Sequence, residues 1–152
     1  MLKELKSFFA DLAGEEKPKQ FDDNDYRLSA AALMVHVATL DHELDPQDRT
    51  RLRELLKVRF ELDDASTEEL IDAAVEADRD AVDFYHFTHT LMRSLDEEGR
   101  KRIILMMWQT AYTDNKVSEF EDNMMWRVAD LLGISTRERV ELKERAADSK
   151  GG

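Results

Sequence analysis

Apolar residues gather in two segments of the chain that lack a polar face. Most positions from Leu28 to Leu40, and again from Ile103 to Tyr112, are apolar. A helix that is apolar on all sides is buried on all sides, because it has no face suited to water. The pattern therefore predicts two central helices, each surrounded by other parts of the chain.

A more amphipathic segment follows each of these central helices. In the first, the residues expected to face inward are Leu52, Leu55, Leu56 and Phe60. In the second, they are Phe120, Met124, Val128, Leu131 and Leu132. Both sets recur at helical spacing. Gly133 directly after the second set is typical of a helix end, because glycine adopts the left-handed backbone found there.

Three more helices complete the predicted domain. Ser66 and Glu69 have the spacing of a capping box, so one helix is expected to begin near Ser66. The next carries its apolar residues on one face, at Phe84, Phe87, Leu91 and Leu95, and the last begins near Ser135. No segment shows sustained strand alternation between turn signals. The predicted fold is therefore all-α, with about seven helices in one domain.

The predicted domain spans residues 26–148, with a tail at 149–152. Residues 1–13 have the apolar spacing of a short amphipathic helix, and the charged stretch 14–25 is interpreted as a linker. Docking on the core or a loose arm is the favoured role for the helix. Contact with a membrane surface is disfavoured, because Glu4 and Asp11 lie among the polar positions.

Charge and cysteine content indicate which kinds of partner and which cellular compartment suit this chain. The formal net charge of −12 disfavours nucleic acid, since phosphate backbones would be repelled, and favours cations or basic protein surfaces. The chain has no cysteine, which fits a reducing cytoplasm and excludes metal sites built from cysteine thiolates. No stretch approaches the length of a membrane span or has the form of a signal peptide.

One acidic motif occurs twice, at the turn after each central helix. The first copy reads Ala38-x-x-Asp41-x-x-Leu44-Asp45-x-x-Asp48, and the second reads Ala111-x-x-Asp114-x-x-Val117-Ser118-x-x-Glu121. The repetition predicts one helix–turn–helix unit used twice, which would give two pseudo-symmetric halves.

Oxygen-rich turns of this kind suit Ca²⁺ or Mg²⁺. The candidate ligands are Asp41, Glu43, Asp45, Asp48, Asp114, Ser118 and Glu121. An EF-hand loop is excluded, because Pro46 stands where that loop needs glycine and Leu52 where it needs glutamate. Any cation site here would be built differently.

Helix capping is the competing explanation for four of these residues. Asp45, followed by Pro46 and Asp48, has the form of a helix start, and Ser118 with Glu121 has the form of a capping box. Capping is favoured for these four residues. Asp41 and Asp114 instead lie where helices end, where the dipole disfavours a carboxylate. An Asx-turn and a bound cation or basic partner remain open for them, with the turn favoured.

Catalytic arrangements are not evident in the sequence. His86 and His89 are three residues apart on one predicted helix, which would suit two metal ligands, yet their apolar neighbours favour partly buried packing roles. No phosphate-binding glycine loop and no nucleophile motif is present. We therefore expect a protein without enzymatic activity.

The doubled motif, the size and the alanine-rich helix Ala30-Ala31-Ala32-Leu33-Met34 together resemble the TerB-like family of tellurite-resistance proteins, over residues 26–146. Members typically show Asp-Gly-x-(Ile/Leu)-(Ser/Asp)-x-x-Glu at both turns. Here His42 and Asn115 replace the glycine, and Asp48 replaces the first closing glutamate.

The resemblance implies an all-helical fold of two pseudo-symmetric halves, a bacterial cytoplasmic role in stress, and an acidic cluster suspected of binding metal. It also implies a relation to the N-terminal domain of DjlA-type membrane co-chaperones; neither a J-domain nor an anchor is evident in this sequence, so we do not expect the co-chaperone role. The expected function is a stress-associated binding module whose acidic turns hold a divalent cation or a basic protein partner. The alternative is a protein-interaction scaffold in which the acids only cap helices.

Overall fold

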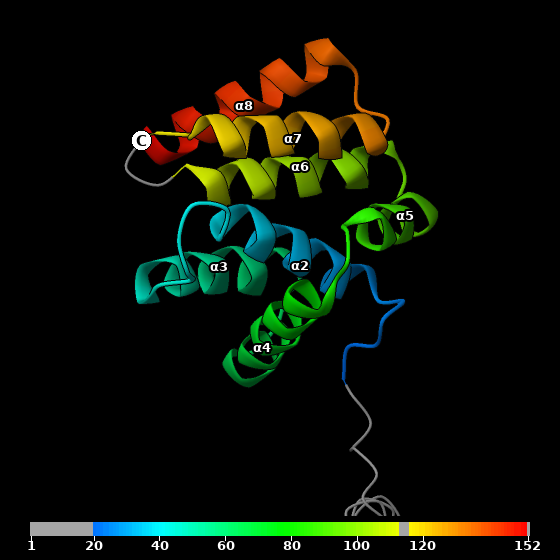
Figure 1. The fold of residues 1–152 in the computed structure, drawn as a ribbon, viewed down its shortest axis with the longest axis vertical. Coiled ribbons are helices and arrows are strands. Elements are labelled where there is room, and N and C mark those ends of the chain that lie inside the picture. The colour runs from blue at the N-terminus through cyan, green and yellow to red at the C-terminus, as the bar shows by residue number, and fades with distance from the viewer. Residues whose placement is uncertain (1–19, 113–115, 152) are drawn as a thin grey trace, which may run out of the picture.

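Seven helices make up the part of the chain that the structure, a computed structural model, describes: residues 20–112 and 116–151 (Figure 1). They are α2 (Tyr26–Ala38), α3 (Pro46–Arg59), α4 (Asp64–Asp80), α5 (Tyr85–Ser94), α6 (Glu97–Ala111), α7 (Glu119–Leu131) and α8 (Thr136–Gly151). These residues contain no strand, so the all-α prediction is confirmed. None of the described helices is long and apolar enough to cross a membrane. The predicted helix at 1–13 and Asp114 lie outside the described residues.

Helix α2 lies at the centre of the domain. Ten of its residues are buried, and side chains such as Leu33 and Met34 have no exposed surface. Helices α3, α4, α5, α6 and α7 all contact it. Figure 1 shows α6, α7 and α8 stacked on one side of α2, with α3 and α4 on the other. The prediction of a buried central helix is confirmed, although the helix ends at Ala38 rather than at Leu40.

Helix α6 is also a buried helix, since its second half is almost wholly buried. It packs against α2, α3, α7 and α8 and so joins the two layers. The pair of central helices expected from the apolar segments is therefore present. The pseudo-symmetry of the two halves stays a prediction.

Short polar side chains fix where most helices begin. Asp25, Asp45 and Asp96 each accept a hydrogen bond from a backbone N–H in the first turn of the helix that follows. The expected start of α4 at Ser66 is wrong, because Asp63 is the capping residue and accepts from the Ser66 N–H at 2.7 Å. Aspartate and serine can both cap a helix, and in α4 the cap is Asp63, three residues before Ser66.

Helices α3 and α7 end in the same way. After α7, Gly133 has φ +72°, and the N–H of Ile134 donates to the carbonyl of Ala129 at 2.9 Å. This is a Schellman ending, so the predicted role of Gly133 is confirmed. After α3, the corresponding left-handed residue is Glu61, with φ 52°, and Leu62 N–H donates to the Lys57 carbonyl at 3.1 Å. A side chain is strained in that conformation.

Two expectations about α7 are wrong. Phe120 is 68% exposed and Leu131 is 36% exposed, although both were expected to face inward. Met125 and Ala129 are buried instead, together with the correctly predicted Met124, Val128 and Leu132. The buried face of α7 therefore lies closer to Met125 and Ala129 than predicted. Adjacent residues on a helix point in directions about 100° apart, so a small rotation exchanges buried and exposed positions.

Phe21 belongs to the core although it lies in the stretch interpreted as a linker. Its side chain is 1% exposed, and the Arg27 guanidinium lies 4.7 Å from its ring centroid. Gln20 beside it donates to the Ser66 hydroxyl of α4 at 3.2 Å. The chain is thus attached to the domain several residues before α2 begins.

Candidate functional site: the turn between α2 and α3

The acidic turn after α2 is organised by a capping box at the start of α3. The Asp48 N–H donates to Asp45 Oδ1 at 2.7 Å, and the Asp45 N–H donates to Asp48 Oδ2 at 3.2 Å. Pro46 occupies the first helical position, where its missing N–H costs nothing. The predicted capping roles of Asp45 and Asp48 are confirmed. The reciprocal bonds also fix the Asp48 carboxylate in a buried position, with 5% of its surface exposed.

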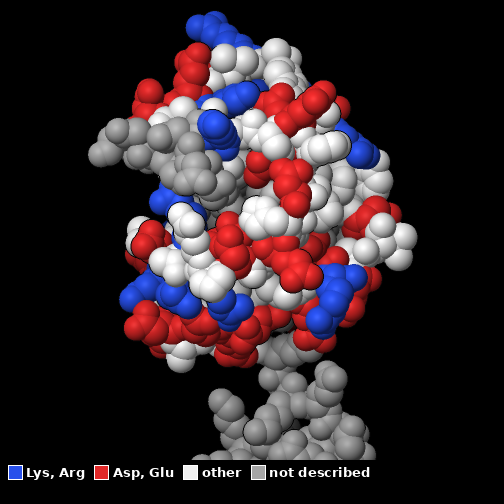
Figure 2. All heavy atoms as spheres, turned by 60° about the vertical axis from the view of Figure 1, so that its left-hand side comes forward, with Lys and Arg blue, Asp and Glu red and all other residues white. Residues whose placement is uncertain are grey.

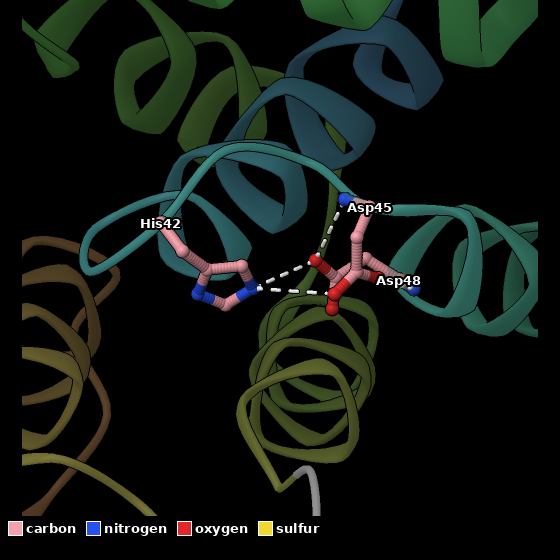
Figure 3. Close-up of side chains that lie close together, drawn as sticks. All are labelled: His42, Asp45 and Asp48. Atoms are coloured by element: carbon pink, nitrogen blue, oxygen red, sulfur yellow. Dashed lines mark hydrogen bonds and ion pairs between the residues drawn. The ribbon is translucent and has the colours of Figure 1, made fainter.

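His42 completes a cluster with these two acids (Figure 3). Its Nε2 lies 2.8 Å from Asp48 Oδ2 and 4.0 Å from Asp45 Oδ2. The turn places His42 opposite the first turn of α3, so that its ring points at both carboxylates. His42 was absent from the predicted ligands. The only signal in the sequence was its place three and six residues before the two acids.

The hydrogen bond from His42 to Asp48 raises the pKa of the imidazole. The negative charges of Asp48, Asp45 and Asp41 act in the same direction, while partial burial opposes them. The charged imidazolium of His42 is therefore more stable than that of a histidine in water, because it gains attraction from the carboxylates. His42 remains 47% exposed, so solvent screens this attraction.

Three ligand atoms of this cluster, one from each residue, lie within 4.8 Å of one another. One imidazole nitrogen with two carboxylate oxygens is a donor set found around zinc and related transition metals. Ca²⁺ and Mg²⁺ prefer oxygen donors throughout. The geometry can therefore hold a divalent ion when the His42 imidazole is neutral.

Other predicted ligands lie elsewhere. Asp41 and Glu43 are exposed, and neither makes a hydrogen bond within the described residues. Asp41 influences the cluster only through its charge on His42. Ser118 and Glu121 form the predicted capping box of α7, with Ser118 N–H donating to Glu121 Oε1 at 2.9 Å. No metal-like group of His, Asp and Glu occurs around them in residues 116–151.

The remaining histidines are not gathered into a site. His36 Nδ1 lies 2.8 Å from Asp78 Oδ1, between α2 and α4. His86 and His89 are both exposed, so the expectation of partly buried packing is wrong for them. His86 Nε2 lies 3.1 Å from the carbonyl of Asp23 and helps to hold residues 20–25 against α5.

Comparison with protein families gives one assignment. The family model described as "Tellurite resistance protein TerB" matches residues 27–144, which include the His42 cluster and reach from α2 into α8. Neither the comparison with curated proteins nor that with solved structures finds a match.

Proposed function

Because the chain belongs to the TerB family, we propose that it is a non-enzymatic binding module associated with tellurite resistance and stress, and that His42, Asp45 and Asp48 hold a divalent metal ion. The convergence of three ligand atoms within 4.8 Å carries the metal proposal. The three residues include no serine, threonine, cysteine or lysine paired with an activating base, which favours binding over covalent catalysis. A cytoplasmic location belongs to the same proposal, supported by the absence of cysteine.

The donor set points to Zn²⁺ rather than to Ca²⁺ or Mg²⁺. An imidazole nitrogen is a good ligand for zinc and a poor one for the two hard cations. Zinc must displace the proton that Asp48 stabilises on His42, so the proposed affinity depends on pH. Below the pKa of His42, affinity should rise about tenfold per pH unit.

Calorimetric titration of the full chain with Zn²⁺, Mg²⁺ and Ca²⁺ tests this proposal. We expect saturable zinc binding by the wild-type protein, with release of one proton, and loss of that binding in His42→Ala. Glu121→Gln is the matched control, because it alters the capping box of α7, which has no histidine partner. Zinc binding that survives His42→Ala, or that does not change with pH, would contradict the proposed site.

A second function is favoured by one observation. Asp48 already accepts hydrogen bonds from His42 and from the Asp45 N–H, so the cluster is satisfied without a metal ion. The acids would then serve only as caps on a protein-interaction scaffold. Figure 2 supports a basic partner, since acidic side chains cover much of the face shown. Absence of any metal binding at millimolar concentration would leave this function in place of the first.

A further inference from the structure

A groove of about 700 Å³ lies on the domain away from the His42 cluster. It is bounded by α2, α4, α5 and the segment that precedes α2. Gln20 holds that segment to Ser66 of α4, and Asp23 holds it to His86 of α5. The groove is therefore a built feature whose walls are tied to one another.

The floor of the groove is apolar. Phe21, Leu28 and Phe87 lie beneath it and are nearly fully buried. Three alanines of α4 and its end, Ala73, Ala77 and Ala81, line it at intervals of four residues and are partly exposed. Small side chains at that spacing allow the backbone of another helix to approach closely. Val82, which is fully exposed, extends the apolar surface at one end.

The rim of the groove is acidic and carries no lysine or arginine. Its acids are Asp23, Glu69, Asp72, Glu76, Asp80 and Asp83. Arg49 pairs with Asp72 from outside the groove, at 2.6 Å. Glu69 and Glu76 are exposed and make no ion pair within the described residues. An apolar occupant would therefore meet a negative potential on entering.

We propose that this groove binds a cationic amphipathic helix of a partner protein. The lining residues of α4 from Glu69 to Asp80 extend about 16 Å, which is the length of about three helical turns. A partner helix with leucines on one face can place them over the alanines. Lysines or arginines beside those leucines, three or four residues apart, then face the acids of α4.

Charge distinguishes this occupant from the chain's own N-terminal segment. Residues 1–13 are amphipathic in sequence, but their two lysines are balanced by Glu4 and Asp11. A segment without net charge gains little from a rim of six acids. A partner helix with several cations gains both apolar burial and electrostatic attraction, and its association should weaken as salt increases.

Fluorescence anisotropy tests the proposal with a labelled synthetic helix of leucine, alanine and lysine, about 15 residues long, whose lysines flank a leucine face. A second peptide of the same pattern carries glutamate in place of lysine. We expect saturable binding of the lysine peptide only, weakened at least about tenfold by Glu76→Lys with Asp80→Lys. The control pair Glu54→Lys with Asp148→Lys changes the net charge equally outside the groove and should alter affinity less than about twofold.

Ala77→Gln provides an independent variant, because it obstructs the floor without changing any charge. It should also weaken binding at least about tenfold. Equal weakening by the two charge-reversal pairs would show nonspecific attraction to an acidic protein and would overturn the proposal. It would also be overturned if deletion of residues 1–16 strengthened binding about tenfold and a peptide of those residues competed, because the groove would then be covered in cis. Circular dichroism confirms that each variant is folded.

Discussion

Replacing His42 with alanine should destabilise the protein at low pH and have almost no effect at high pH. The imidazole Nε2 lies 2.8 Å from a carboxylate oxygen of Asp48, which is 5% exposed, while His42 itself is 47% exposed. A hydrogen bond to a charged group contributes about 1.5–3 kcal/mol to stability. Screening at the exposed histidine lowers this to about 0.5–1 kcal/mol.

The sign of this pH dependence follows from the raised pKa of His42. A histidine whose pKa is higher in the folded state contributes its full stabilisation below the unfolded-state pKa, 6.5. That stabilisation is lost as pH rises through the folded-state pKa. The free energy of unfolding of His42→Ala should therefore lie below that of the wild type at pH about 5.5, and the two should converge by pH about 8.5.

Urea denaturation of both proteins at pH values across this range, with a chelator present so that metal binding adds nothing, measures the difference. His89→Ala is the control, because His89 is exposed and makes no hydrogen bond or ion pair with a described residue. Its effect should be small and independent of pH. A constant difference between wild type and His42→Ala, or one that grows at high pH, would refute the proposed ion pair.

Two further predictions concern stability. Glu61→Gly should raise the free energy of unfolding by about 0.5–1 kcal/mol in thermal or urea denaturation, because Glu61 has φ 52° at the end of α3; a loss of stability would show that this backbone is not strained. Leu33→Ala should lower it by about 2–5 kcal/mol, because Leu33 is fully buried in α2; a cost below about 1 kcal/mol would contradict the central position of that helix.

The sequence predicted the helices well because their signals are local. An uninterrupted apolar segment such as Ala30 to Val35 leaves a buried helix as the simplest outcome, and capping boxes are defined by residues only three apart. The wrong prediction for Phe120 also has a cause in local helix geometry. Adjacent helical positions differ by about 100°, so the sequence fixes an amphipathic face only approximately.

The site was harder to predict because it depends on the path of a turn. Asp41 and Glu43 flank His42 in sequence, yet among the described residues it is His42 that gathers with Asp45 and Asp48. Nothing in the spacing of these residues specifies that orientation, since consecutive side chains in a turn point in different directions. The capping role of Asp48 follows from local spacing, whereas its contact with His42 depends on the turn folding back on α3.

The central position of α2 has a consequence for the order in which the protein can fold during synthesis. The ribosome makes α2 before any of the helices α3 to α7 that cover it, and α6 is complete only at Ala111. A nascent chain that ends before α6 must leave one side of α2 uncovered. Stable tertiary structure should therefore form late in translation, and the apolar surface of Leu33 and Met34 would be open to chaperones until then.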